Sequence, residues 1–100
     1  MAWKVIDILS GNHIKISPKW KWAGQSGDKV LVKGYLVSLS GLPAELAEVM
    51  AKNRLSSTIK DKEITLRNPT KAENGVLYCD VFYNDINISK YFADFGKELH

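Results

Sequence analysis

The alternation of apolar and polar residues at the start of the chain predicts a β-hairpin. Residues 3–9 are rich in β-branched and aromatic side chains, and residues 13–17 alternate polar with apolar at the period of a half-buried strand. Residues 10–12, Ser-Gly-Asn, have the chemistry of a tight turn. Pro18 is expected to end the second strand and to leave residues 18–28 as a loop with two tryptophans.

The middle of the chain predicts one strand followed by the longest helix. Residues 29–37 are mostly apolar and indicate a third strand that is covered on both faces for part of its length. Pro43 suits the first turn of a helix, and Glu45 suits its positive end. A helix over residues 44–59 follows, with Leu46 and Met50 flanking its apolar stripe. The stripe itself recurs every three or four residues: Ala44, Ala47, Ala51, Leu55 and Thr58/Ile59.

The last third predicts two further strands and a short helix. Residues 63–67 alternate as a fourth strand that Asn68-Pro69 is expected to stop, and residues 76–83 form a fifth strand after an Asn-Gly turn. Residues 88–95 indicate a helix with one apolar side. The order β-β-β-α-β-β-α predicts a mainly β fold with helices (α+β), a five-stranded OB-fold barrel.

Length and composition point to one small domain over residues 1–100. The chain has 45% apolar and 25% charged residues, which is ordinary globular composition. Its only cysteine, Cys79, excludes an internal disulfide, and one cysteine with two histidines is too few for a structural zinc site. No apolar run is long enough to span a membrane, so we expect a soluble domain without a membrane partner. The cytoplasm is the default location, although a leader removed ahead of Met1 would leave no trace in the sequence.

Positive charge is concentrated in the first third of the chain, where a nucleic-acid site is predicted. The net charge is +3 overall, and residues 1–33 hold six lysines against two aspartates. Cations interleaved with indoles are typical of surfaces that stack bases and follow phosphates in single-stranded nucleic acid. The candidate residues are Lys15, Lys19, Trp20, Lys21, Trp22, Lys29 and Lys33. The alternative is that the two tryptophans fold back over a barrel edge, with the lysines simply solvated around them.

Other chemically notable residues have ordinary structural explanations. His13 has no carboxylate or cysteine neighbour in sequence and is expected at a turn or surface, not on a metal. Cys79 lies in an apolar strand, where a thiol usually behaves as a small buried hydrophobe. About half of the aromatic residues of the last quarter are expected in the core, and the others suit a protein-binding or dimer surface. They are Tyr78, Phe82, Tyr83, Tyr91, Phe92 and Phe95.

Four stretches resemble the staphylococcal nuclease homologues, and the resemblance covers nearly the whole chain. The family carries Asp-Gly-Asp-Thr in its first hairpin, Val-Arg-Leu-x-Gly-Ile-Asp on its third strand, Gly-Lys-x-Val-x-Leu after its helix and Gly-Arg-x-Leu-Ala-x-Val on its fifth strand. The corresponding stretches here are residues 10–13, 30–39, 58–66 and 75–81. The structural positions of the pattern are occupied by Gly11, Gly34, Lys62, Ile64, Leu66 and Val81.

The chemical positions of that family are altered in this chain. The resemblance implies two phosphate-binding arginines and a glutamate that orients the attacking water, and these positions hold Leu31, Val76 and Leu39. The carboxylates that would hold calcium correspond to Asn12 and Leu36. Leucine and valine can neither neutralise a phosphate nor activate water. The aliphatic side chains that replace the ionic groups could either pack the old cleft shut or receive an apolar partner.

Three functions remain open from the sequence. The first is a non-catalytic nuclease-like OB-fold domain that binds single-stranded nucleic acid or a protein and needs no cofactor. The second is a calcium-dependent phosphodiesterase with unrecognised catalytic groups, the one case in which Ca²⁺ is expected. The third is a pure protein-interaction module.

Overall fold

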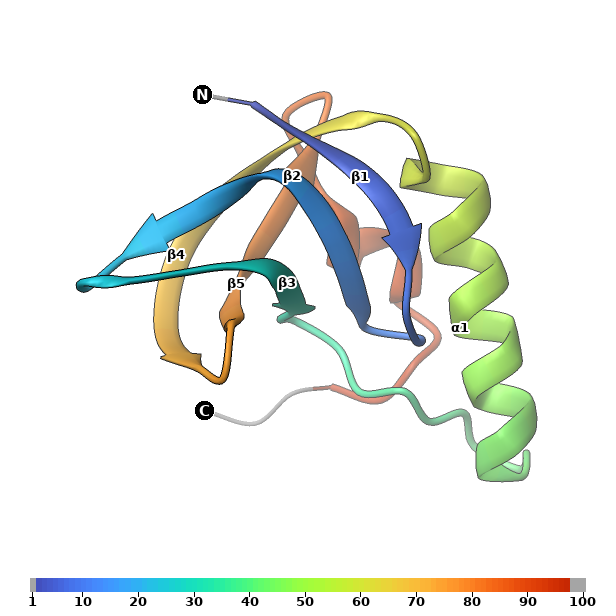
Figure 1. Cartoon of the computed structure of the whole chain (residues 1–100). Coiled ribbons are helices and arrows are strands. Elements are labelled where there is room, and N and C mark those ends of the chain that lie inside the picture. The colour runs from blue at the N-terminus through green and yellow to red at the C-terminus, as the bar shows by residue number, and fades with distance from the viewer. Residues whose placement is uncertain (1, 98–100) are drawn as a thin grey trace.

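Five strands of mixed direction close into a barrel with one long helix beside it, in the computed structural model of residues 2–97 (Figure 1). The strands lie in the order β3-β2-β1-β4-β5, and parallel pairing between β3 and β5 closes the barrel. A short sixth strand extends the sheet beyond β5. The predicted mainly β, OB-like fold is therefore confirmed. The strands are β1 (Trp3–Ile8), β2 (His13–Trp22), β3 (Gln25–Val32), β4 (Glu63–Glu73), β5 (Val76–Tyr83) and β6 (Ile86–Asn87).

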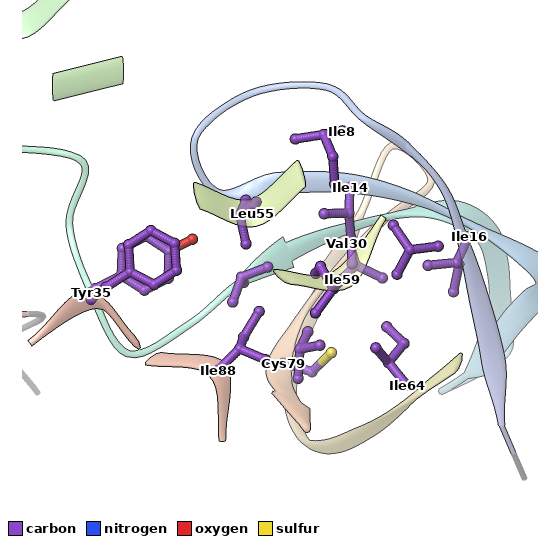
Figure 2. Packing of buried hydrophobic residues seen from close by; sticks show 14 of the residues in the cluster. Ile8, Ile14, Ile16, Val30, Tyr35, Leu55, Ile59, Ile64, Cys79 and Ile88 are labelled. Carbon is purple, nitrogen blue, oxygen red and sulfur yellow. The ribbon is translucent and has the colours of Figure 1, made fainter. Parts of the chain in front are cut away.

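The barrel interior is filled by the apolar residues that alternate along its strands. Ile14 on β2 lies opposite Val30 on β3, and Val30 lies opposite Leu77 on β5, so the three buried side chains form one layer across the sheet. Helix α1 (Ala44–Ile59) closes one side with Leu55 and Ile59, which point into the same cluster in Figure 2. Burying such aliphatic side chains stabilises the fold by about 1.5 to 3 kcal/mol each.

The predicted loop over residues 18–28 is wrong, because this segment forms the far half of a long hairpin. β2 continues through Pro18 to Trp22, the chain turns at Ala23-Gly24 with positive φ at both residues, and β3 begins at Gln25. A register shift between Lys15 and Trp20 leaves Pro18 outside the regular ladder, where its missing N–H costs no hydrogen bond. The hairpin tip projects on the side of the molecule away from α1 (Figure 1).

Two strand boundaries also differ from the prediction. β3 ends at Val32 instead of residue 37, and the next segment contains Gly34 at φ 106° and a single bridge from Leu36 to Gly96. β4 continues past Asn68-Pro69 to Glu73, because a register shift between Arg67 and Lys71 absorbs both residues. The end of β4 is thus decided by its hairpin pairing with β5, whereas β3 ends shortly before Gly34, whose positive φ departs from strand geometry.

The main helix was predicted with the observed bounds, and its buried residues are Ala47, Ala51, Leu55 and Ile59. The expected second helix is only a 3₁₀ turn, η1 (Ile88–Phe92), capped by the side chain of Asn87, which accepts a hydrogen bond from the Ser89 N–H. Phe92 stacks on Tyr35 with ring centroids 4.0 Å apart. Within residues 2–97, no helix is long and apolar enough to cross a membrane.

Candidate nucleic-acid interface

Two of the predicted lysines lie side by side on the outer face of the barrel and share one carboxylate. Lys15 on β2 is directly opposite Lys29 on β3. Their Nζ atoms lie 3.9 and 3.8 Å from the two carboxylate oxygens of Asp28. Exposed pairs of this kind contribute little to stability, but the carboxylate cancels part of the positive charge. Lys15 and Lys29 therefore form a weaker cationic patch than the sequence suggests.

Lys33 directly follows the end of β3, and its side chain also has a hydrogen-bond partner. Its Nζ donates a hydrogen bond of 3.2 Å to the backbone carbonyl of Asn68 on β4. The side-chain amide of Asn68 in turn donates to the carboxylate of Asp80 at 2.9 Å. Lys33 is thus held beside an acidic residue of β5.

Trp20 cannot act as an exposed stacking platform, so its assignment to the binding site is corrected. Its side chain is only 1% exposed, and its Nε1 donates a 2.8 Å hydrogen bond to the backbone carbonyl of Lys29. Trp22, two residues on, lies on the same side of the strand and is partly buried against the core. The two indoles share one face, as their spacing requires, but that face turns towards the barrel interior.

Lys19 and Lys21 line a groove at the edge of β2. β1 begins at Trp3, and Lys4 lies opposite Ser17, so β1 does not pair with the segment from Pro18 to Trp22. The groove in this gap has a volume of about 460 Å³. Its lining consists of Trp3, Pro18, Lys19 and Lys21. Among residues 2–97, neither lysine forms an ion pair.

Trp3 is the groove residue that sequence reasoning missed. Its side chain is partly exposed, and among the described residues its buried Nε1 has no hydrogen-bond acceptor. The sequence offered a weak signal, because an indole at the very start of a strand is available to cover the open end of a barrel. Only the pairing of β1 with β2 reveals that it meets Lys19 and Lys21.

A second hollow has the wrong charge for a polyanion. It lies between the start of β4 and the β5–β6 turn, and two of its residues are acidic. Its lining comprises Ala2, Glu63, Ile64, Thr65, Phe82, Asn84 and Asp85. Carboxylates would repel phosphates, so the groove beside Trp3 is the better candidate.

The positions that correspond to the family's phosphate-binding arginines come together on the outer sheet face. Leu31 on β3 lies opposite Tyr78 on β5, and Val76 lies opposite Lys29 two residues along the same pair of strands. Leu39 is partly buried against the core, whereas Leu36 is 48% exposed. The fold thus brings Leu31 and Val76 onto the outer face that also carries Lys15 and Lys29, and the two corresponding positions themselves are aliphatic.

Asn12 lies in the first turn and His13 directly after it, and each makes a hydrogen bond that accounts for its place in the fold. The Asn12 carbonyl accepts from the Val32 N–H at 2.8 Å, and His13 Nδ1 lies 3.2 Å from the Ser10 hydroxyl. Within residues 2–97, no three side chains of His, Cys, Asp or Glu gather closely enough to hold a metal ion.

Two aromatic side chains of β5 each lie next to a cationic side chain on the outer face of the barrel. The Lys71 Nζ lies 5.3 Å from the centre of the Tyr78 ring, and the Arg67 guanidinium lies 4.4 Å from that of Phe82. Both cations also have acidic neighbours, Glu73 for Lys71 and Asp85 for Arg67. Tyr78 and Phe82 are thus partly covered by these contacts.

Within residues 2–97, two buried groups have strongly raised pKa values, and both lie in the core. Burial raises the pKa of the Cys79 thiol to about 12, so it stays protonated and unreactive at neutral pH. Burial, and then the charge of Glu48, raises the pKa of Tyr35. The Tyr35 hydroxyl donates to the Gly11 carbonyl at 2.7 Å, while the Gly11 N–H donates to Glu48. These contacts fix the first turn to α1 and to the segment after β3.

Comparison with known proteins leaves the family open. The chain matches no protein-family model, and no curated protein is significantly similar to it. The resemblance to the staphylococcal nuclease homologues stays a prediction that rests on the residues quoted above.

Proposed function

We propose that this chain is a non-catalytic OB-type domain that binds single-stranded nucleic acid in the groove beside Trp3. The observation that carries the proposal is the meeting of an indole, a proline and two lysines along one hollow, the lysines having no ion pair within residues 2–97. The indole and proline offer an apolar surface to a base, and the lysines offer charge to the adjoining phosphates. A volume of about 460 Å³ is sufficient for a base with its sugar.

The path of the strand continues along β2 in this proposal. Lys19 and Lys21 bind the phosphates at the groove, and Lys15 with Lys29 extends the cationic track on the same strand pair. Trp22 lies near the hairpin tip and contributes at most a partly exposed edge. Of the residues predicted from the sequence, Lys19 and Lys21 at the edge of β2 are thus the centre of the proposed site.

We expect no catalysis, because unsuitable side chains stand at the positions where the resemblance implies catalytic and calcium-binding groups. Leu31 and Val76 cannot stabilise charge on a pentavalent phosphorus, and Leu39 cannot orient water. Asn12 and Leu36 offer no carboxylate to a calcium ion.

The test is fluorescence anisotropy with a labelled single-stranded oligonucleotide of about 12 nucleotides, titrated at several salt concentrations. The double variant Lys19→Gln/Lys21→Gln should bind more weakly than the wild type. The slope of log affinity against log salt should also be shallower by about 1.4, if each lysine contacts one phosphate. The matched control, Lys60→Gln/Lys90→Gln, removes the same charge from exposed positions after α1 and on η1.

The aromatic contribution is tested separately. Trp3→Leu should weaken binding by about 1 to 3 kcal/mol, whereas Trp3→Phe should retain most of it, because a flat ring remains. Equal affinity of all four variants and the wild type would refute the groove as the site. Cleavage of the oligonucleotide on addition of calcium would instead support the phosphodiesterase. No binding by the wild type at low salt would favour a protein-interaction module.

A further inference from the structure

Helix α1 exposes a second apolar surface on the side that faces away from the barrel. Leu46, Val49 and Met50 are 50%, 53% and 40% exposed, and Leu42, just before the helix, is 42% exposed. We call Leu42, Leu46, Val49 and Met50 the outer stripe. Large aliphatic side chains exposed in a group usually mark an interaction surface.

The outer stripe lies opposite the buried face of α1. The buried residues 47, 51, 55 and 59 recur every four positions, and an advance of about 100° per residue places residues 46, 49 and 50 on the far side of the helix. The amino-terminal turns that carry the stripe extend past the end of the barrel in Figure 1. The neighbouring strands therefore leave these side chains uncovered.

The charges beside the stripe match each other across a two-fold axis. Glu45 and Lys52 are seven residues apart, so they lie on the same flank of the stripe. Within residues 2–97 neither forms an ion pair. If two copies of α1 pack antiparallel about an axis near Val49, each Glu45 faces the Lys52 of the other copy, which gives two ion pairs by symmetry.

The remaining charged residues of the helix point elsewhere. Glu48 accepts a hydrogen bond from the Gly11 N–H on the barrel side. The Arg54 guanidinium binds Asp94 at 2.6 Å on the other flank. Neither opposes the approach of a second helix over the outer stripe.

We propose that a second copy of this chain covers the outer stripe, in a two-fold antiparallel α1–α1 dimer. Four side chains from each copy make a small contact, so the dimer is weak and forms at high protein concentration. Because α1 lies away from the β2–β3 hairpin, the dimer leaves the groove beside Trp3 open on both copies (Figure 1).

The test is sedimentation velocity of the full chain from about 1 μM to about 1 mM at low salt. The wild type should shift from monomer to dimer in this range. Val49→Glu, which places two like charges near the axis, should stay monomeric at every concentration. Ile86→Gln is the matched control, since Ile86 is also 41% exposed but lies on β6, and this variant should dimerise like the wild type.

Charge reversal tests the identity of the occupant. Glu45→Lys alone and Lys52→Glu alone should each weaken the dimer about tenfold, because two attractive pairs become repulsive. The double variant Glu45→Lys/Lys52→Glu should restore wild-type association. A wild type that stays monomeric at about 1 mM, or a double variant that fails to recover, overturns the proposal; circular dichroism melting confirms that each variant is folded.

Discussion

Replacing Trp20 by phenylalanine separates its burial in the core from a role in binding. The substitution removes the indole N–H that donates to the Lys29 carbonyl at 2.8 Å, and leaving that acceptor without its donor costs about 1 to 3 kcal/mol. The smaller ring also loses part of the apolar burial of a side chain that is 1% exposed, which costs about 1 kcal/mol more. The free energy of unfolding should therefore fall by about 2 to 4 kcal/mol.

Urea denaturation followed by circular dichroism measures this loss, which corresponds to a decrease in melting temperature of roughly 10 to 25 °C for a domain of this size. Trp22→Phe is the comparison, and it should cost less than about 1 kcal/mol, because Trp22 is only partly buried. At a temperature where it is folded, Trp20→Phe should bind the oligonucleotide as tightly as the wild type. Near-normal stability with lost affinity would show that the Trp20 ring is available to a base and that the burial argument is incorrect.

Three further predictions concern a close backbone contact, the thiol and an ion pair. Gly27→Ala should lower stability by about 3 kcal/mol or more in urea denaturation, since the added Cβ would lie 2.3 Å from the Gly75 carbonyl oxygen; a loss below about 1 kcal/mol would mean the turn moves freely. The Cys79 thiol should react with a thiol reagent only after denaturation, because burial raises its pKa to about 12; rapid reaction of the native protein at neutral pH would contradict this. The hydrogen bond from Arg54 lowers the pKa of Asp94 below its usual 3.8. The ionised Asp94 therefore stabilises the fold fully above pH 3.8, and this contribution is lost as the pH falls through the lowered pKa of the folded state. In urea denaturation at several pH values, the stability difference between wild type and Asp94→Asn should disappear on acidification, and a constant difference would count against the pair.

Burial of the tryptophans and the charge balance of the lysines could not be read from residue order. The spacing of Trp20 and Trp22 correctly places them on one face, but it does not indicate whether that face is inside or outside. Lys15 and Lys29 become neighbours only through the pairing of β2 with β3, and their shared Asp28 lowers the local positive charge. Lys19 and Lys21 remain unpaired within residues 2–97 because no acidic side chain is folded against them.

Local chemistry by itself determined the first turn, the long helix and the fifth strand. The turn at residues 10–12, the helix over residues 44–59 and the strand over residues 76–83 form as predicted, since turn propensity and apolar periodicity act over a few neighbouring residues. The apolar stripe predicted for the helix is also its buried side, since Ala47, Ala51, Leu55 and Ile59 are buried, whereas the flanking Leu46 and Met50 are exposed.

Tertiary structure alone decided how far the strands extend and which residues form the groove. Pro18 and Asn68 interrupt strands by local rules, yet register shifts let β2 and β4 continue, because each strand then pairs with the next strand of its own hairpin, β3 or β5, as far as the tight turn. The pairing of β1 with β2 leaves β2 without a β1 neighbour beyond Ser17 and brings Trp3 to Lys19 and Lys21. In the groove Trp3 meets Lys19 and Lys21, which lie sixteen or more positions away, and no local pattern contains that information.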